Sequence, residues 1–376
     1  MRILFIAGGS APTVFALAPL ATAARNSGHE VFMAATDDMM TTVAAAGLPP
    51  VSMTRRDIRF FIGFDRAGNS LEIPAEPVEQ LLFTGRWFGR MAADSLPALH
   101  SLVAAWRPEL VVGGTMSYAA PLIAHRLGVP YVRHLWDISD PGLMDRGADE
   151  ELRPELEAAG LDRLPEPDLT VDICPPSIQR PDAPPAQLMR WAPANRQRQL
   201  EPWMYTPSER RRVCVTSGHR VARDQNFAFL RDLAATVTAL DMEMFVAAPE
   251  DAAAELRAEL PGVRADWMPL DVVIPQCDLL VSHAGGVTVM TAMSAGVPQL
   301  LLPSRDAKSI APSRRMAEYG SAITLVGEEE SPGAIDKACT ELMTDPAYAA
   351  RARDLAGEVA GLPKPHEVVT ELERLV

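Results

Sequence analysis

The sequence has little positive charge and no long apolar run. Its 35 Lys and Arg residues stand against 49 Asp and Glu residues, giving a formal net charge of -14. Such a chain repels phosphate backbones and anionic lipid surfaces, so neither a nucleic acid nor a membrane is an expected partner. No apolar stretch reaches the ~18 residues that cross a bilayer, and the amino terminus lacks the pattern of a cleavable signal peptide.

Paired cysteines are also missing. Cys174, Cys214, Cys277 and Cys339 show no CxxC spacing, and three of them stand in apolar stretches. Thiols in such surroundings behave as small hydrophobic side chains. This pattern indicates a reducing compartment, and with the absence of a signal peptide it predicts a cytoplasmic protein.

The length and the element pattern predict two α/β domains. A chain of 376 residues exceeds one usual hydrophobic core, so two domains of roughly 150 to 200 residues are expected. A proline-rich stretch at 175–185 is followed by a new strand pattern at Arg212. We expect a first Rossmann-like, acceptor-binding domain at 1–190, a linker at 191–211, a second, nucleotide-sugar-binding domain at 212–362 and a C-terminal helix at 363–376.

Short apolar runs mark the expected strands. They alternate with helical spans, which predicts parallel sheets. The expected strands are Arg2–Ala7, His29–Ala35, Leu110–Gly114 and Tyr131–Trp136 in the first half, and Val213–Thr216, Glu243–Ala248, Asp278–His283 and Gln299–Pro303 in the second.

One strand-to-helix turn indicates a phosphate site. In the sequence CDLLVSHAGGVT a strand delivers His283, Gly285 and Gly286 to a helix start. Backbone N–H groups at such a start are unpaired and the helix dipole adds positive charge, so a pyrophosphate can bind there. Tight packing alone is the alternative explanation for the glycines.

The segment WMPLDVVIPQCDLLVSHAGGVTVMTAMSAGVPQLLLP resembles the nucleotide-sugar signature of family 1 glycosyltransferases. The stretches MRILFIAGGS, PLATAARNSGHEV, ELRPELEAAGLDRLPEPDL, DICPPS and LEPWMYT extend a similarity to the angucycline deoxysugar transferases of the landomycin and urdamycin type over the whole chain. The resemblance implies a GT-B fold of two facing Rossmann-like domains. It also implies a thymidine diphosphate sugar as co-substrate, without a further cofactor. Carried over, the base pocket is Trp267, Met268 and Pro269, and the diphosphate is held by His283, Gly285, Gly286 and Val287.

Two further groups of residues are candidates for the donor site. Ser217 and Gly218 end the first strand of the second half, where hydroxyls and amides can reach the phosphates. An ordinary turn is the alternative. Arg220 would add a charge-assisted bond to a phosphate, or is simply a solvated arginine.

The sequence departs from the family at the sugar-binding positions. Many members carry an Asp–Gln pair that bonds sugar hydroxyls, and Lys308 and Ser309 stand there in this chain. A site built to bond a hydroxyl rejects a sugar that lacks it, so the missing pair fits a donor with fewer hydroxyls. A 2,6-dideoxyhexose such as olivose is expected.

A second departure concerns the catalytic base. The family's histidine in the first loop is replaced by Gly8-Gly9-Ser10, and Ser10 alone is too weak a base. The resemblance to the angucycline enzymes implies Asp137 as the substitute, with a turn or N-cap aspartate as the alternative. A carboxylate is better matched to a phenol, of pKa near 10, than to an alcohol.

The stretch 55–77 is polar around the apolar residues Phe60, Phe61 and Ile62. It predicts either an acceptor-binding loop or lid, or a loop that packs these side chains into its own core. The expected acceptor is an aromatic polyketide aglycone.

These features predict an inverting, metal-independent glycosyltransferase that moves the deoxysugar to a phenolic oxygen of an angucycline-type polyketide in antibiotic biosynthesis. No DxD pair or His/Cys ligand spacing predicts a metal site. Attack by an aromatic carbon, and a non-catalytic helper of a partner transferase, remain open, as does a homodimer. A dinucleotide-dependent oxidoreductase is disfavoured, since Pro12 and Thr13 stand where GxGxxG needs glycine.

Overall fold

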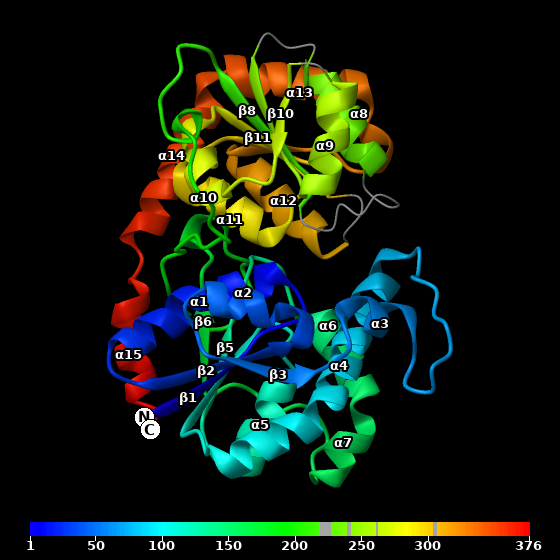
Figure 1. Cartoon of the computed structure of the whole chain (residues 1–376), viewed down its shortest axis with the longest axis vertical. Coiled ribbons are helices and arrows are strands. Elements are labelled where there is room, and N and C mark those ends of the chain that lie inside the picture. Colours follow the sequence, from blue (N-terminus) through cyan, green and yellow to red (C-terminus); the bar gives the residue numbers. More distant parts are fainter. Residues whose placement is uncertain (219–226, 239–241, 261, 304–306) are drawn as a thin grey trace. The chain divides into compact units, whose positions relative to one another are not determined.

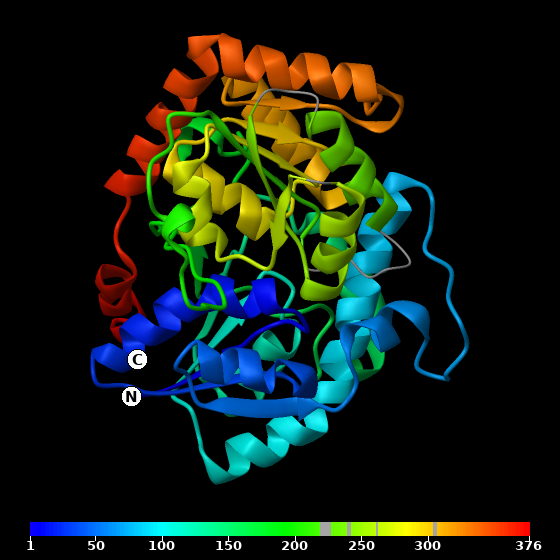
Figure 2. The same cartoon turned by 45° about the horizontal axis from the view of Figure 1, so that its top comes forward.

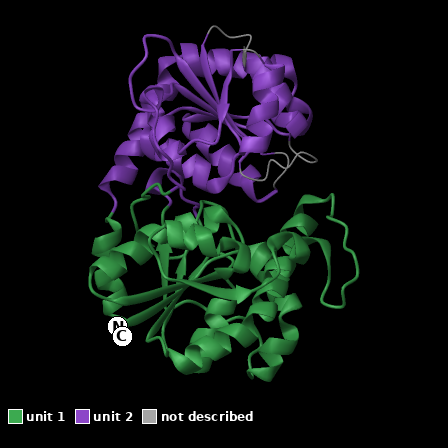
Figure 3. Ribbon diagram, viewed as in Figure 1, with its two compact units in different colours: residues 1–173, 182–194, 363–376 green, residues 174–181, 195–362 purple. Residues whose placement is uncertain are grey.

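The chain forms two compact units in a computed structural model that describes residues 1–218, 227–238, 242–260, 262–303 and 307–376. Unit 1 consists of Met1–Ile173, Asp182–Ala194 and Pro363–Val376, and unit 2 of Cys174–Pro181 and Asn195–Leu362 (Figure 3). The units differ from the expected domain ranges because the chain crosses between them more than once. Residues 174–181 pack with unit 2, and the C-terminal helix packs with unit 1.

Unit 1 is built on a seven-stranded parallel sheet in the order β3-β2-β1-β4-β5-β6-β7. The order reverses between β1 and β4, which is where sheets of this type bind ligands beyond the carboxyl ends of their strands. The strands are β1 Arg2–Ile6, β2 Glu30–Thr36, β3 Pro50–Thr54, β4 Leu110–Gly114, β5 Tyr131–His134, β6 Leu169–Asp172 and β7 Gln187–Leu188.

Helices cover this sheet. They are α1 Ala11–Asn26, α2 Met40–Ala45, α3 Ile58–Gly63, α4 Pro77–Ala105, α5 Ala119–Leu127, α6 Gly142–Glu151, α7 Arg153–Ala158 and α15 Pro365–Glu373. The last of these, α15, contacts α1, and both views show the two side by side (Figures 1 and 2).

Short 3-10 turns lie at Asp37–Met39 (η1), Pro176–Ile178 (η2), Pro202–Met204 (η3), Ile274–Gln276 (η4) and Gly327–Glu329 (η5).

Part of the expected loop at 55–77 is helical. Helix α3 begins after Asp57, whose carboxylate accepts a hydrogen bond from Phe60 N at 3.0 Å. This N-cap bond satisfies one of the backbone donors that a helix start leaves unpaired. The residues proposed to bind the acceptor therefore stand on a capped helix.

Unit 2 repeats the architecture with a six-stranded parallel sheet in the order β10-β9-β8-β11-β12-β13. The strands are β8 Arg212–Thr216, β9 Glu243–Ala247, β10 Arg264–Asp266, β11 Leu279–Ser282, β12 Gln299–Leu301 and β13 Ala322–Thr324. The helices are α8 Phe227–Thr238, α9 Glu250–Glu259, α10 Leu270–Val273, α11 Gly286–Ala295, α12 Ala307–Tyr319, α13 Pro332–Thr344 and α14 Pro346–Gly361.

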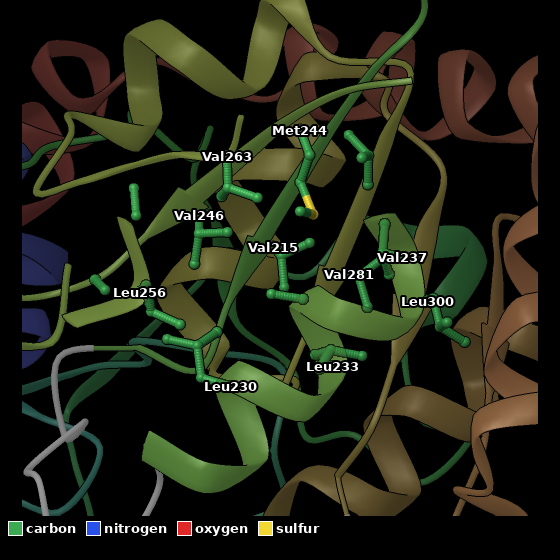
Figure 4. Close-up of a cluster of buried hydrophobic side chains, with 14 of the residues drawn as sticks. Val215, Leu230, Leu233, Val237, Met244, Val246, Leu256, Val263, Val281 and Leu300 are labelled. Carbon is green, nitrogen blue, oxygen red and sulfur yellow. The ribbon is translucent and has the colours of Figure 1, made fainter. Parts of the chain in front are cut away.

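The core of unit 2 follows from the alternation of side chains along its strands. Val215, Val246 and Val281 point to one face and pack with α8 and α9 (Figure 4). Cys214 and Phe245, their neighbours in sequence, point to the opposite face. Both faces are apolar because helices cover both, as in other parallel sheets.

None of the four cysteines forms a disulfide, and all four are buried, including the three that the sequence places in apolar stretches. Burial raises the pKa of the Cys214 and Cys339 thiols to about 12. These thiols are therefore protonated core side chains at neutral pH. Within the described ranges no helix combines the length and the hydropathy needed to cross a membrane.

Candidate donor and acceptor sites

The expected donor residues gather at one edge of the unit 2 sheet. Strands β8 and β11 are paired in parallel, with Thr216 opposite Ser282, and the strand order reverses between them. Their carboxyl ends lead into Ser217 and Gly218 on one side and His283 on the other. The structure thus brings these three predicted residues together at the switch point of the sheet.

The imidazole of His283 packs against two glycines. A Cβ atom built on Gly218 would lie 2.7 Å from His283 Cε1, and one built on Gly285 would lie 2.5 Å from its Nε2. Gly218 also has a φ of 78°, which favours glycine. Side chains at either position would displace the ring, so the glycines define where the imidazole stands.

The turn after His283 opens helix α11. Ala284 has a φ of 62°, and its N–H donates to Ser282 Oγ at 3.2 Å. Gly285 occupies the N-cap position without a side-chain cap, and Gly286 and Val287 follow in the first turn. The backbone N–H groups of this turn and the positive end of the helix dipole have the properties expected of an anion-binding site.

The hydroxyls at the end of β8 have different roles. Thr216 Oγ1 donates to Ala247 O at 2.9 Å and accepts from Gly218 N at 3.1 Å, so it holds the turn together. Ser217 is 2% exposed, and its Oγ has no hydrogen-bond partner among the described residues. Ser217, rather than Thr216, therefore retains an unused hydroxyl beside His283. Arg220 lies outside the described residues.

The expected base-binding residues follow β10. Trp267 is half-buried, and Pro269 stands at the start of α10. Met268 is 4% exposed, and its side chain packs in the core beside Cys214 and Phe245. Its side chain is therefore a core element, and only its backbone remains for ligand contacts.

In unit 1, Asp137 lies three residues beyond His134, where β5 ends, earlier than the sequence predicts. Asp137 is 6% exposed, and its Oδ1 accepts hydrogen bonds from Ser139 N at 2.9 Å and from Ser139 Oγ. The Asp137 carboxylate thus makes the contacts of a turn aspartate, the alternative to a catalytic base that the sequence leaves open. These contacts also fix its orientation.

The segment before Asp137 is fastened to β4. Trp136 N donates to Thr115 Oγ1 at 3.0 Å. The indole fills the space beside Gly114, where a Cβ would lie 2.4 Å from Trp136 Cε3. The position of Asp137 therefore depends on the end of the neighbouring strand.

Ser10 is the other expected catalytic residue. It is 6% exposed and precedes α1, where its hydroxyl forms no capping bond. Its carbonyl accepts from Thr13 Oγ1 at 2.7 Å. Ser10 thus lies in the loop between β1, which ends at Ile6, and α1, and β1 borders the switch point of the unit 1 sheet.

A buried histidine, His134, also lies near this edge, and no sequence pattern indicates it. His134 Nδ1 lies 2.7 Å from Leu135 O, so this nitrogen is the donor. Burial lowers the pKa of His134 to about 4. The imidazole is consequently neutral at pH 7 and fully enclosed, which makes it unsuited to replace the missing first-loop histidine as a base.

The apolar residues of α3 divide between core and surface. Phe61 is 2% exposed, and Arg90 Nε donates to its carbonyl at 3.1 Å. Phe60 stacks on Phe64 at 5.4 Å, with the Arg56 guanidinium 4.2 Å from its ring centre. Phe61 thus has the core role of the alternative interpretation, whereas Phe60 and Ile62 remain partly exposed.

Within the described part of the chain, no group of three or more His, Cys, Asp or Glu side chains is arranged to hold a metal ion.

Comparison with known proteins identifies the family. Residues 22–218 match the N-terminal domain, and residues 231–375 the C-terminal domain, of the family described as erythromycin biosynthesis protein CIII-like. The L-demethylnoviosyl transferase of Streptomyces niveus is 32% identical over 99% of this chain and 97% of its own length. The aclacinomycin-T 2-deoxy-L-fucose transferase of Streptomyces galilaeus is 27% identical over 100% and 96%.

Solved structures give the same result. The glycosyltransferase SsfS6 of Streptomyces sp. SF2575, complexed with thymidine diphosphate, has a TM-score of 0.89 and 33% identity over 100% of this chain and 99% of its own. The spinosyn rhamnosyltransferase SpnG has a TM-score of 0.86 and 29% identity over 100% of both chains. The expected α/β, GT-B architecture with two Rossmann-like parallel-sheet units is thereby confirmed.

The similarity is broader than the angucycline type. The matched proteins include noviosyl, deoxyfucosyl and desosaminyl transferases, so they do not single out one sugar or one acceptor. What they share is transfer of an unusual sugar in antibiotic biosynthesis. The chain belongs to the erythromycin biosynthesis protein CIII-like family of glycosyltransferases, enzymes that transfer deoxysugars in the biosynthesis of antibiotics.

Proposed function

We propose that the chain transfers a 2,6-dideoxyhexose of the olivose type from thymidine diphosphate to a phenolic oxygen of an angucycline-type polyketide, with inversion. The observation that carries the donor half is the His283 imidazole, held between Gly218 and Gly285 at the start of α11. Related structures that contain thymidine diphosphate support this assignment.

Unit 2 stabilises the leaving group in this proposal. Negative charge develops on the diphosphate as the bond to the anomeric carbon breaks. The N–H groups of Gly286 and Val287, the helix dipole and His283 are preorganised to stabilise that charge. The buried Ser217 hydroxyl adds a further donor, and Trp267 and Pro269 contact the base.

Unit 1 supplies the acceptor chemistry. Asp137 accepts the phenolic proton, and the phenol oxygen then displaces the diphosphate in one step, which inverts the anomeric carbon. Its contacts with Ser139 and the Thr115–Trp136 bond support a fixed orientation for the carboxylate. Ser10 and the partly exposed side chains Phe60 and Ile62 contact the acceptor.

The missing sugar-binding pair supports a deoxysugar donor. Lys308 and Ser309 stand in the first turn of α12, and Ser309 is 5% exposed. A sugar that lacks hydroxyls does not need a hydrogen-bond partner at Lys308 and Ser309. We expect the thymidine diphosphate donor of a 2,6-dideoxyhexose to have at least a tenfold higher kcat/KM than thymidine diphosphate glucose, a difference of about 1.4 kcal/mol. Competition between the two donors measures the ratio, and a preference for glucose would contradict the assignment of Lys308 and Ser309.

Incubation with thymidine diphosphate deoxysugars and a panel of polycyclic phenols tests the function. Mass spectrometry detects transfer, and NMR assigns the linkage and anomeric configuration of the product. An O-linked, inverted product is expected. A carbon-linked product would instead identify an aromatic carbon as the nucleophile, and nucleotide binding without turnover on any acceptor would identify a helper of a partner transferase.

A further inference from the structure

Residues 196–198, near the start of the second segment of unit 2, contact the turn that carries Trp267. Arg198 Nη1 donates to the backbone oxygen of Trp267 at 2.9 Å and also bonds the Asp266 carboxylate. Its Nη2 lies 3.4 Å from Glu201 Oε1. One guanidinium thus joins the end of β10 to the residue that follows it.

The two residues before Arg198 contact the same turn. The guanidinium carbon of Arg196 lies 5.8 Å from the centre of the Trp267 ring. Gln197 Nε2 donates to Asp271 Oδ2 at 2.9 Å. Residues 196–198 therefore contact the Trp267 backbone, the Trp267 ring and helix α10, which follows the turn.

This turn has few supports of its own. Strand β10 spans three residues, Arg264–Asp266, and it is the edge strand of the sheet, while α10 spans four residues, Leu270–Val273. Short elements at a sheet edge fix the connecting backbone weakly.

We propose that Arg198 and Arg196 are positioning residues for nucleotide-base recognition. Arg198 sets the backbone at Trp267 and Arg196 sets the plane of its indole, so that the ring is oriented for the base before the nucleotide arrives. This inference rests on the proposed contact between Trp267 and the base. Preorganisation of this kind raises affinity by removing the cost of ordering the ring on binding.

The two arginines are suited to this role for different reasons. The guanidinium of Arg198 is a rigid fork that can bond two oxygens at once, which a lysine ammonium does less well. The guanidinium of Arg196 stacks over an aromatic face, a contact that favours one ring orientation. Neither needs to touch the phosphates, so both are expected to affect the base and not the diphosphate.

Titration calorimetry on the full chain, with thymidine diphosphate and with inorganic pyrophosphate as separate probes, tests the proposal. R198A is expected to weaken thymidine diphosphate binding about tenfold and R196A about threefold, with pyrophosphate binding unchanged. R231A is the matched control. Arg231 is a partly exposed arginine of α8 in unit 2 that pairs with Asp232, and its loss is expected to leave both affinities unchanged.

A double-variant cycle tests whether Arg198 acts through Trp267. In the W267A background, R198A is expected to change thymidine diphosphate affinity by less than twofold, because the ring that it positions is gone. The same loss in both backgrounds, or an equal loss for pyrophosphate, would overturn the proposal. Unchanged thymidine diphosphate affinity in R198A would overturn it as well.

R198K serves if R198A does not fold. It keeps the charge but not the fork, and a loss of about threefold in thymidine diphosphate affinity is expected. Wild-type affinity in R198K would overturn the role of the fork. Failure of the wild-type chain to bind thymidine diphosphate at all would overturn the proposed function itself, an outcome distinct from the others.

Discussion

Two side chains, His283 and Asp137, account for most of the proposed chemistry, and backbone geometry fixes both. The imidazole stands against two glycines whose Cβ atoms would lie within 3 Å of its ring. The carboxylate accepts two hydrogen bonds from Ser139 and follows a tryptophan fastened to Thr115. Neighbouring residues thus orient each of these side chains.

Replacing His283 with alanine is expected to weaken thymidine diphosphate binding by tenfold or more. In the proposed site the imidazole forms a hydrogen bond with a charged phosphate, and such bonds are about twice as strong as neutral ones. Titration calorimetry measures the loss. H366A is a suitable control, because His366 is an exposed residue of unit 1. Unchanged affinity together with unchanged turnover would remove His283 from the phosphate site.

Replacing Asp137 with asparagine is expected to lower turnover by ~10²- to 10⁴-fold, the usual contribution of a general base. Asparagine keeps the size and a side-chain oxygen for the Ser139 contacts but cannot take a proton. Donor affinity should stay at its wild-type value. The same change at Asp140, which accepts a bond from Gly142 N at 3.0 Å, is the control. Turnover of D137N within about threefold of wild type would make Asp137 purely structural.

At the scale of elements, helices α4 and α6 pack closely against each other. A Cβ on Gly85 would lie 1.8 Å from Met144 O, and one on Gly147 would lie 2.1 Å from Leu82 O. The two helices therefore touch through their backbones, which only glycine allows at these positions. The contact holds α6, which follows the Asp137 loop, against the longest helix of unit 1.

Replacing Gly85 with alanine is expected to lower the free energy of unfolding by about 2 kcal/mol or more, because the backbones must separate. Gly357 offers the matched control. It lies on the exposed side of α14 with no atom within 4 Å of a built Cβ, so G357A should stabilise by about 0.5 to 1 kcal/mol. Denaturant unfolding measures both. Equal effects at the two positions would contradict the tight helix contact.

At the scale of the whole molecule, each unit is built from segments that are separate in the sequence. Helix α15 ends the chain after unit 2 but packs on α1 of unit 1, where His29 Nε2 lies 2.9 Å from Glu373 Oε1. Val368, Val369 and Leu372 of this helix are buried. The stability of unit 1 consequently depends on the last residues of the chain.

Replacing Leu372 with alanine is expected to destabilise unit 1 by about 2 to 5 kcal/mol, the usual cost of a cavity at a fully buried leucine. Thermal unfolding measures this change. Thymidine diphosphate affinity should be unaffected, since the donor residues belong to unit 2. R374A, at an exposed residue of the same region, should change stability by less than about 0.5 kcal/mol. A stable L372A chain would show that α15 contributes little.

Features that depend on neighbouring residues can be predicted from the sequence alone. The apolar strands, the buried thiols and the turn at His283 are all visible in short stretches, because burial and backbone geometry there depend on local pattern. Strands β3, β6, β7, β10 and β13, which are not predicted from the sequence, lie at or next to the edges of the two sheets. Their short sequences include proline or polar residues, such as Pro50, Thr170 and Asp266, and they form because the strands nearer the centre of each sheet offer unpaired edges.

Which side chains remain available for binding depends instead on tertiary packing. Nothing in the sequence distinguishes Met268 from Trp267, or Phe61 from Phe60, as a binding residue. In the structure the side chains of Met268 and Phe61 are buried in cores. Likewise, no local pattern joins Arg198 to Trp267, a contact between residues far apart in the chain. Such contacts depend on where whole elements pack, so the sequence can predict a site's chemistry while the fold selects the residues that perform it.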